Sequence, residues 1–584
     1  MSPVAFSSSD DQLPLGEYLF RRIRSLGIGS IFGVPGDFNL GLLEHLYSVQ
    51  GLKWVGCCNE LNSAYSADGY ARMSGKLGVV VTTFGVGELS AINGISGAFA
   101  EYVPVLHIVG TTPTIFKADG RFTHHLVTDK SVLHAADHYS YENMVGAVSC
   151  CAETITHADE AYQKIDHVLS EILYHKRPGY LFVPIDLADS LVDSTSLLTT
   201  PGEMFYERPI DPNPSQTLKI ATLILDKIYH SSNPCILADV FTDRFDMTET
   251  VREFVKSTQI PNFASMMGKG ILDETENSYV GSYNGNESNQ AIIDWIDSSD
   301  LLIHIGDYDN EINSGHDSIH SGLNEIITLN HERIRVCSEI FTDVNFVYVL
   351  PAMLALLEKA KIPETITDNW PIDKILMNHP TPVPTPHVSQ TDLFYSLQEF
   401  LRPNDVLVCD TGSFMFAIPD LVFPQGVKYI GQQFYLSIGY ALPATLGVGK
   451  ALQDMGFESR LILVEGDGAA QMTIQEFGNY IQEGISPTVL LLNNSGYTVE
   501  RIIKGPERTY NDIVPHWQWC DLFRVFGDYT ETKSSSVKVK SQKDLSLALN
   551  SIQSGKINMV EVIMDKMDCP WRFIKMTANS KSKV

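Results

Sequence analysis

The sequence predicts an α/β fold made of three open, mainly parallel domains. Short apolar runs alternate with helix-like segments along the chain, and this alternation is typical of parallel sheets, whose strands need crossover connections. The chain also has 584 residues. At roughly 100 to 200 residues per domain, that length predicts about three domains, with two or four as alternatives.

Strands are predicted where an apolar run is short and bounded by turn residues. They fall into three groups: 29–34, 53–57, 77–83, 103–109 and 180–184; then 234–238, 301–305 and 325–329; then 406–409, 460–464, 488–492 and 558–563. Polar, proline-dotted residues 192–215 are typical of a linker. We therefore expect domains at 1–192, 193–361 and 391–584, with a proline-rich, non-helical linker at 362–390.

Charge argues against two classes of partner. The chain has 70 acidic and 42 basic side chains and a formal net charge of −28, which would repel a nucleic-acid backbone and an anionic membrane surface. An anion site would have to be made locally, from helix N-termini, a metal or a few cations. The nine cysteines include no C-x-x-C pair, so we expect reduced, mostly buried thiols and no zinc site of regular cysteine spacing.

No targeting segment is expected. Residues 1–14 lack the basic and apolar stretches of a secretory or transit peptide. No apolar run approaches the roughly 18 residues that a membrane span requires. The final Ser582-Lys583-Val584 approximates a peroxisomal signal but lacks its leucine. These features predict a cytoplasmic protein.

The strongest chemical signal is a G-D-G motif at 466–468, followed 27 residues after Asp467 by Asn494. The surrounding pattern predicts a strand, a helix and the next parallel strand, at 461–464, 475–482 and 489–492. Asp467 and Asn494 should therefore lie at the carboxyl edge of neighbouring strands, where open α/β sheets bind ligands. Alone, G-D-G is more often a tight turn after a strand, and the spacing is what favours a ligand site.

The residue types at this edge suit a metal and a diphosphate. The carboxylate of Asp467, the amide oxygen of Asn494 and the backbone carbonyl of Gly496 are hard donors of the kind that Mg²⁺ prefers. Gly466 and Gly468 would let the backbone come close to a diphosphate at the following helix N-terminus. The sequence therefore predicts a magnesium-diphosphate site here.

The motif and its spacing resemble the signature of the thiamine-diphosphate enzyme superfamily, G-D-G followed at a similar distance by N-N. Further motifs resemble the pyruvate/indolepyruvate type of decarboxylase: VPGDFNLGLLEHL at 34–46, CNELNSAYSADGYAR at 58–72, His124-His125 and GYTVE at 496–500. The resemblance covers about residues 14–565. It implies that Asp467, Asn494 and the Gly496 carbonyl hold the magnesium of bound thiamine diphosphate.

The resemblance implies roles for the other motifs. Glu60 would hydrogen-bond the cofactor's aminopyrimidine from a site dry enough to raise its pKa. Four groups would handle protons and the substrate carboxylate: Asp37, His124, His125 and Glu500. Further cofactor contacts would be the wedge Ile438, with Leu436, Thr411, Ser413, Gly466, Gly468 and Ala469. Taken singly, Glu60 suits a surface helix start and the histidine pair a solvated loop.

The chain departs from the best-known pyruvate decarboxylases at three positions. Ala469 stands where they have a serine, and Leu436 where they have a glycine whose carbonyl faces the aminopyrimidine. A backbone carbonyl persists with any residue, so we expect cofactor binding to survive. Phe241 stands where yeast-type enzymes have a substrate-activating cysteine, which argues against that kind of activation.

Four segments instead resemble the fungal transaminated-amino-acid decarboxylases: EGDGAAQMTIQE, THHLV, FYLSIGYALPATLGVG and KGPERTYND. That resemblance implies non-oxidative decarboxylation of phenylpyruvate and other aromatic or branched 2-oxo acids in the Ehrlich pathway, in a large apolar pocket. Candidate lining residues are Met415, Val499 and Ile503, which would equally suit core packing. The alternatives are a pyruvate decarboxylase of fermentation, a thiamine-diphosphate-sensing regulator, and a flavin-containing enzyme of the same fold.

In the resembling family, the cofactor bridges the first domain of one subunit and the third domain of another. The resemblance therefore implies a homodimer or homotetramer, because a monomer could not complete the site.

Overall fold

The computed structural model describes residues 12–128, 136–320, 322–323, 325–364, 374, 379–513 and 515–583. The chain divides into two compact units. The first comprises Met1–Arg208, Leu442–Glu458 and Thr473–Ile485, and the second comprises Pro209–Ala441, Ser459–Met472 and Ser486–Val584. None of the described helices combines the length and apolar character that crossing a membrane requires.

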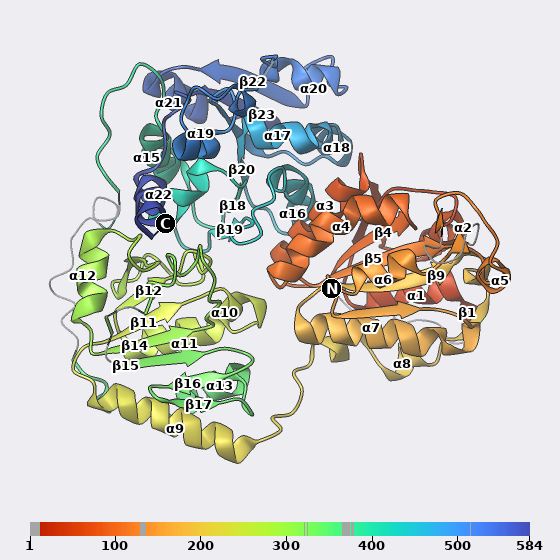
Figure 1. The fold of residues 1–584 in the computed structure, drawn as a ribbon, viewed down its shortest axis with the longest axis horizontal. Helices are drawn as coiled ribbons and strands as arrows, with labels where there is room; N and C mark the ends of the chain where they lie inside the picture. The colour runs from red at the N-terminus through yellow and green to blue at the C-terminus, as the bar shows by residue number, and fades with distance from the viewer. Residues whose placement is uncertain are drawn as a thin grey trace. The chain divides into compact units, whose positions relative to one another are not determined.

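The first unit is built on a parallel sheet with strand order β3-β2-β4-β5-β9-β8. Its strands are β2 (Ser30–Gly33), β3 (Lys53–Gly56), β4 (Gly78–Thr83), β5 (Val105–Thr111), β8 (Cys151–Thr154) and β9 (Gly179–Pro184). Helices cover both faces, with α3 and α4 on one side and α1 and α7 on the other (Figure 1). The central strands β4, β5 and β9 are buried along their whole length, as expected for a sheet covered on both faces.

The helices of this unit are α1 (Leu15–Ser25), α2 (Leu40–Glu44), α3 (Glu60–Ser74), α4 (Val86–Ala100), α5 (Thr114–Asp119), α6 (Ser140–Val145), α7 (Ala161–His175) and α8 (Ser196–Thr199), with 3-10 helices η1 (His45–Ser48), η2 (Ala158–Glu160), η3 (Ile185–Leu187) and η4 (Gly202–Tyr206). Two short antiparallel pairs accompany them, β1 (Gln12–Pro14) with β10 (Leu191–Asp193) and β6 (Val127–Thr128) with β7 (Ala136–Asp137).

The segment 192–215, for which the polar composition predicts a linker, contains several short elements of secondary structure. It contains the end of β10, α8, η4 and the start of α9. The Arg22 guanidinium donates to the Thr200 carbonyl at 2.6 Å, and the Tyr206 hydroxyl donates to the Leu26 carbonyl at 3.1 Å. These bonds attach the segment to α1 and its C-terminal turn, and the compact unit accordingly extends to Arg208.

Helix α16 (Ala441–Met455) packs closely on α3, because a glycine of each helix faces the other's backbone. A Cβ at Gly69 would lie 2.3 Å from the Ala444 carbonyl oxygen, and one at Gly447 would lie 1.8 Å from that of Ser66. The Ser66 hydroxyl also donates to the Pro443 carbonyl at 2.9 Å. These contacts fix α3, the helix that begins at Glu60. The 3-10 helix η8 (Ile474–Glu476) and α18 (Phe477–Glu483) belong to the same unit.

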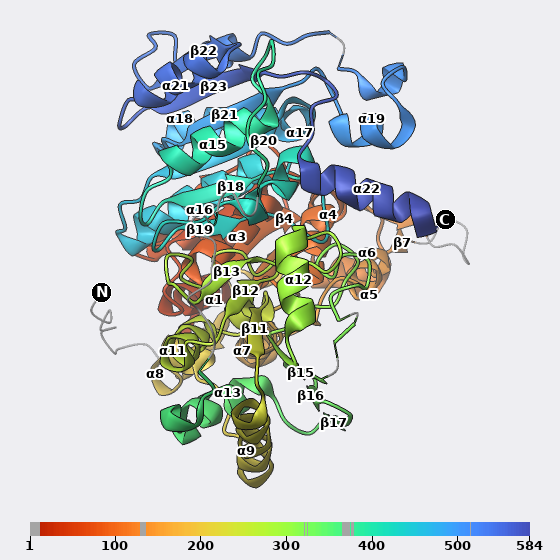
Figure 2. The same cartoon turned by 90° about the vertical axis from the view of Figure 1, so that its left-hand side faces the viewer.

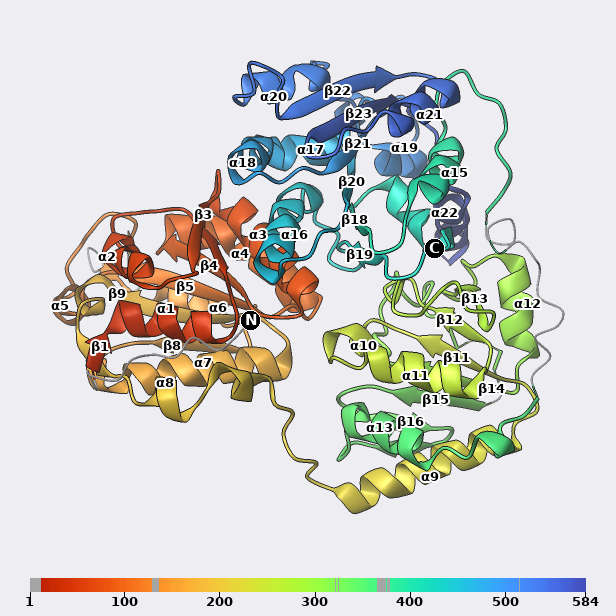
Figure 3. The ribbon, with the colours of Figure 1, turned by 180° about the vertical axis from the view of Figure 1, so that it is seen from behind.

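The second unit contains two sheets. The first has strand order β13-β12-β11-β14-β15-β16-β17, with an antiparallel hairpin at the β16-β17 end of an otherwise parallel sheet. Its strands are β11 (Pro234–Ala238), β12 (Asn262–Ala264), β13 (Tyr279–Ser282), β14 (Leu301–Ile305), β15 (Glu325–Leu329), β16 (Ile334–Val336) and β17 (Glu339–Phe341). The associated helices are α9 (Pro214–His230), α10 (Phe241–Arg244), α11 (Thr248–Thr258), α12 (Gln290–Ser298), α13 (Phe346–Leu356) and η5 (Lys359–Lys361). Helices α9 and α13 lie side by side against this sheet (Figure 3).

The other sheet of this unit is parallel, with strand order β19-β18-β20-β21-β23-β22. Its strands are β18 (Val406–Cys409), β19 (Lys428–Ile430), β20 (Leu461–Gly466), β21 (Thr488–Asn493), β22 (Ser534–Val539) and β23 (Ile557–Ile563). The helices are α15 (Gln390–Phe400), α17 (Asp467–Thr473), α19 (Thr498–Lys504), α20 (Leu522–Val525), α21 (Gln542–Asn550) and α22 (Trp571–Lys583), with η6 (Ser413–Phe416), η7 (Ile418–Asp420), η9 (Thr509–Asn511) and η10 (Trp519–Asp521). Helices α19 and α22 are neighbours (Figure 2).

A buried arginine connects the two sheets of the second unit. Arg572, at the start of α22, is 1% exposed, forms an ion pair with Asp420 of η7 and donates to the Asn284 side chain at 2.5 Å. The Ser282 hydroxyl, at the end of β13, donates to the Pro419 carbonyl at 2.6 Å. Together these bonds hold α22 and η7 against the β13 end of the first sheet.

The predicted α/β class and mainly parallel sheets are confirmed. Strands β11, β14, β15 and β18 have the predicted limits, and the other predicted strands agree within two residues. The helix predicted at 475–482 begins as η8 and continues as α18, and it is preceded by α17, which was not predicted. Within the proline-rich linker, residues 365–373 and 375–378 lie outside the described part of the chain, as does Val584 of the terminal tripeptide.

The prediction for the cysteines is half correct. All nine are free thiols, but only Cys235 and Cys409 are buried, whereas Cys58 is exposed and the others are intermediate. The expectation of mostly buried thiols is wrong because cysteines such as Cys151 lie on an edge strand of a sheet, where one side of the strand has no neighbouring strand.

Candidate active site

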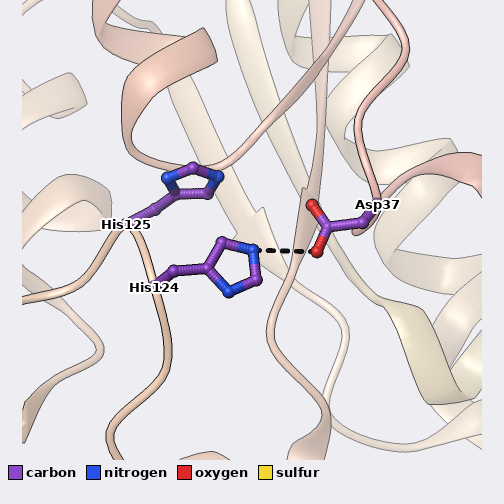
Figure 4. A group of neighbouring side chains, drawn as sticks. All are labelled: Asp37, His124 and His125. Carbon is purple, nitrogen blue, oxygen red and sulfur yellow. Dashed lines mark hydrogen bonds and ion pairs between the residues drawn. The ribbon is translucent and has the colours of Figure 1, made fainter.

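Three predicted residues of the first unit come together: Asp37, His124 and His125 (Figure 4). The His124 Nε2 atom lies 2.8 Å from the Asp37 carboxylate, and the two imidazole rings are 4.5 Å apart between centroids in an edge-on arrangement. Asp37 follows β2, and the histidines follow α5. The Asp37 and His124 side chains are each 56% exposed, so the cluster is open to a ligand.

Aromatic side chains hold this cluster in place. Phe38 contacts both imidazoles, with ring centroids 5.1 Å from His124 and 6.4 Å from His125, and Phe84 lies 5.8 Å from the His125 ring. The backbone of His125 adopts φ 70°, a conformation that non-glycine residues rarely occupy. The Tyr141 hydroxyl donates to the His125 carbonyl at 2.6 Å. Packing and this hydrogen bond therefore fix a backbone conformation that orients the pair.

Glu60 is the first residue of α3. The Asn59 side chain caps this helix by accepting the Asn62 N–H at 2.9 Å. A Cβ at Gly87 would lie 3.2 Å from the Glu60 carboxylate, so the absence of a side chain at Gly87 leaves room for that carboxylate. Glu60 is intermediate in burial in the single chain. The structure therefore presents it at the helix start that the sequence predicts.

In the second unit, Asp467 and Asn494 lie at the carboxyl ends of β20 and β21, which are paired strands. Asp467 is 2% exposed and Asn494 is 8% exposed. Among the described residues, neither the Asp467 Oδ1 atom nor the Asn494 Oδ1 atom has a hydrogen-bond partner. Burial raises the pKa of Asp467 to about 7, although backbone N–H groups of Gly468 and neighbouring residues act to lower it. Two buried, unpartnered oxygens fit a hard divalent cation.

The glycines around this edge of the sheet differ in whether the fold has room for a side chain at their positions. A Cβ at Gly468 would lie 2.6 Å from the Tyr497 ring, and one at Gly496, where φ is 139°, would lie 2.0 Å from the Asn511 carbonyl. A Cβ at Gly466 or Gly412 would meet nothing within 4 Å. Gly468 and Gly496 are therefore required by the fold, whereas Gly466 and Gly412 leave space that a diphosphate could occupy.

Two hydroxyls follow β18 at the same cavity. The Thr411 hydroxyl is buried and has no partner among the described residues, and Ala469, which is also buried, lines the same cavity. The Ser413 hydroxyl accepts a hydrogen bond from the Gln390 amide at 2.8 Å, and a hydroxyl that accepts one bond keeps a proton to donate. Both hydroxyls fit the predicted contact with a diphosphate.

Leu436 has φ 58°. This is the left-handed backbone conformation that glycine adopts most readily, and glycine is the residue that the resembling enzymes have at this position. Ile438, the predicted wedge, lies in a turn before α16. The Asp410 carboxylate accepts the Gly439 and Ala441 N–H groups at 3.2 and 2.7 Å. Asp410 therefore anchors the segment that brings Leu436 and Ile438 to the cavity.

All the predicted residues of this unit line one cavity of about 490 Å³. They are Thr411, Ser413, Met415, Leu436, Ile438, Gly466, Asp467, Gly468, Ala469, Asn494, Gly496, Val499, Glu500 and Ile503. Met415 is buried, Val499 is half-buried on α19, and Glu500 and Ile503 on the same helix are exposed. The structure thus places the three candidate pocket residues beside the candidate metal ligands.

The sequence reasoning missed several lining residues. Phe414 and Phe416 come from η6, Phe573 and Met576 from α22, and Ile312 from the segment between β14 and β15. The aromatic neighbours of Met415 were visible in the motif CDTGSFMF, but Ile312 and the α22 residues lie far from every motif. Only the fold brings them to the cavity.

Comparison with known proteins identifies the family. The chain matches the models for the N-terminal TPP-binding domain, the central domain and the C-terminal TPP-binding domain of thiamine pyrophosphate enzymes, at residues 14–133, 221–357 and 410–556. The chain belongs to the thiamine pyrophosphate enzyme family. Both groups of site residues fall in or beside the two TPP-binding matches, which supports thiamine diphosphate as the cofactor of this thiamine pyrophosphate enzyme.

The relatives of this chain indicate which reaction the enzyme catalyses. The chain is 39% identical to the transaminated amino acid decarboxylase of Saccharomyces cerevisiae, over 97% of this chain and 94% of that protein. It is 34% identical to pyruvate decarboxylase isozyme 3 of Saccharomyces cerevisiae, over 98% of this chain and all of that protein, and 35% identical to the pyruvate decarboxylase of Aspergillus parasiticus, over 96% of each. This thiamine pyrophosphate enzyme is therefore a member of the 2-oxo acid decarboxylases.

Proposed function

We propose that the chain decarboxylates 2-oxo acids with large apolar side chains, phenylpyruvate among them, to aldehydes. The observation that carries this proposal is the cavity beside Asp467 and Asn494, whose lining includes apolar side chains from η6, α19 and α22. Burial of an aromatic substrate side chain there would be favourable at about 25 cal/mol per Å² of apolar surface. The 39% identity to a transaminated amino acid decarboxylase supports the same substrate class.

We propose that Mg²⁺ is held by Asp467, Asn494 and the backbone carbonyl of Gly496. The metal would give the two side-chain oxygens that lack a hydrogen-bond partner a ligand to bind. It would also hold the cofactor's diphosphate, since Mg²⁺ is commonly bound by a few protein oxygens together with phosphates. Thr411, Ser413 and the open backbone at Gly412 and Gly466 would contact the diphosphate. Ile438 would support the cofactor from the anchored turn.

Bound thiamine diphosphate supplies the nucleophilic carbon and the electron sink for loss of CO₂. Glu60 would hydrogen-bond the aminopyrimidine and favour its proton-accepting form, which requires the carboxyl group at the start of α3. Asp37, His124, His125 and Glu500 would move protons during aldehyde release, because carboxylates and imidazoles are the side chains that most often serve as general acids and bases. The hydrogen bond between Asp37 and His124 would set the tautomer of that imidazole.

The active form would be a homodimer or homotetramer, as typical members of this enzyme family are oligomeric. Sedimentation at enzyme-assay concentration, with and without cofactor, would measure this. An active species with the mass of one chain would contradict it.

The substrate proposal is tested by kcat/KM for phenylpyruvate, a branched 2-oxo acid and pyruvate, with thiamine diphosphate and Mg²⁺ supplied. We expect phenylpyruvate to exceed pyruvate. A preference for pyruvate would leave the family assignment intact but assign the chain to fermentation. Cofactor binding without turnover of any of these acids would favour the regulatory alternative.

A further inference from the structure

A second cluster of metal-ligating side chains lies in the first unit, on strand β8 and helix α7. Cys151 and Glu153 are two residues apart on β8, and side chains at that spacing lie on the same face of a strand. His167 projects from α7 toward them: its Nδ1 atom lies 3.1 Å from a Glu153 carboxylate oxygen and 3.9 Å from the Cys151 sulfur. The three ligand atoms are all within 4.8 Å of one another.

We propose that Cys151, Glu153 and His167 bind a divalent transition metal of the zinc class. Sulfur, imidazole nitrogen and carboxylate oxygen are the donors that zinc accepts, at about 2.0 to 2.3 Å. Such bond lengths place tetrahedral ligands about 3.3 to 3.8 Å apart, so the observed separations need only small side-chain movements to close around an ion. Three protein ligands leave the fourth position for water.

The surroundings support this assignment. His167 binds through Nδ1, and its Nε2 atom faces a carboxylate oxygen of Glu171 at 4.0 Å, one turn along α7. A carboxylate on the outer nitrogen of a metal-bound histidine is a frequent arrangement, because it fixes the tautomer. His175 lies 3.3 Å from the other Glu171 oxygen. The carboxylates of Glu153 and Glu171 flank the His167 ring on its two nitrogens, so negative charge on both sides of the ring favours a cation here.

Binding would displace the thiol proton: the S–H bond breaks, a sulfur–metal bond forms and one proton passes to solvent. No redox partner is needed. The ion would join β8, the last strand on its side of the sheet, to α7. Regular cysteine spacing in the sequence does not reveal this site, because the site uses a single cysteine and its histidine comes from another element. Cys150, which directly precedes β8, does not belong to it, because its sulfur lies 3.5 Å from the Arg177 carbonyl oxygen and is not one of the three clustered ligand atoms.

Cobalt provides the test, because Co²⁺ occupies zinc sites and a thiolate bound to it gives a near-ultraviolet charge-transfer band. The full chain would be stripped with EDTA, supplied with excess Mg²⁺ to fill the oxygen site, and titrated with Co²⁺ and then Zn²⁺. We expect one equivalent of Co²⁺ to produce the band and Zn²⁺ to abolish it. Co²⁺ at Asp467 and Asn494 would give no sulfur band, so the two sites are distinguishable.

Single substitutions distinguish binding of Co²⁺ by these three side chains from unspecific adsorption of Co²⁺ to the protein surface. Cys151→Ala should abolish the band, and His167→Gln should weaken binding by about tenfold or more. Cys150→Ala is the matched control and should retain the band. Decarboxylase turnover should survive Cys151→Ala, since this residue lies outside the candidate active site. Absence of the band from the wild-type chain, or its persistence in Cys151→Ala, would overturn the proposal.

Discussion

The Tyr141 hydroxyl donates a hydrogen bond to the backbone carbonyl of His125, at a residue whose φ is 70°. The bond therefore supports a conformation that orients the histidine pair without contacting either imidazole nitrogen. We expect Tyr141→Phe to lower kcat about fivefold, because one hydrogen bond contributes about 1 kcal/mol.

The measurement is steady-state kinetics across pH, since a positioning role should reduce kcat and alter its pH profile while leaving KM nearly unchanged. Tyr139→Phe is the control, because Tyr139 is 54% exposed. Equal losses in the two variants would show that the hydrogen bond has no role in positioning.

Glu60→Gln should preserve folding and lower turnover by about 100-fold or more, because an amide cannot take part in proton transfer as a carboxyl group does. Circular dichroism and single-turnover aldehyde release would measure the two effects. The control Glu44→Gln changes an exposed glutamate of α2. Aldehyde production at the wild-type rate by Glu60→Gln would refute the assigned role.

Two glycines of the same motif should respond differently to alanine. Gly468→Ala should lower the Tm of the cofactor-free chain, because its methyl group would lie 2.6 Å from the Tyr497 ring. Gly466→Ala should leave that Tm nearly unchanged but reduce the rise in Tm on adding thiamine diphosphate and Mg²⁺. Full cofactor stabilisation of Gly466→Ala would place the diphosphate elsewhere.

Ile503→Trp should reduce kcat/KM for phenylpyruvate about tenfold and change that for pyruvate much less, because a larger side chain fills part of the cavity. Ile503 is 47% exposed, so the fold should tolerate the change. Ile574→Trp is the matched control, at 51% exposure and outside the cavity lining. A uniform loss for both acids would argue against a role in specificity.

Glu88 predicts a pH dependence of stability. Burial raises its pKa from 4.5 to about 8, partly opposed by the Gly85 N–H that it accepts at 2.9 Å. Between pH 4.5 and about 8 the folded state therefore holds a proton that the unfolded state releases, so this residue makes stability fall as pH rises through that window, by up to about 1.4 kcal/mol per pH unit.

Glu88→Gln should flatten this decline, as measured by urea unfolding at several pH values. Glu332→Gln, at an exposed position, should not. An identical pH slope of stability in wild-type and Glu88→Gln chains would show that the Glu88 carboxyl group is already ionised in the folded state across this pH window.

The strands that sequence could predict are those with continuous apolar runs, such as β11 and β14, which are buried along their whole length. The missed strands include β8 and β22 at sheet edges and β17 in the terminal hairpin. Strand β22 reads SSSVKV and has exposed positions, so its formation depends on pairing with β23 and not on its own hydrophobicity.

The same division holds for the site. Asp467 and Asn494 could be paired from sequence because the crossover between two adjacent parallel strands fixes where both side chains emerge. Ile312 and Phe573 could not, since their approach to the cavity depends on contacts between two sheets. The φ of Leu436 shows a further limit: a glycine-like backbone conformation persists there under a leucine.

The buried guanidinium of Arg572 has a consequence for how ligands enter and leave the cavity. Swinging α22 away from the cavity would strip this group of Asp420 and Asn284, and separating a buried ion pair typically costs about 3 to 5 kcal/mol. Helix α22 should therefore stay in place when a ligand enters or leaves, and so should the part of the cavity lining that Phe573 and Met576 form.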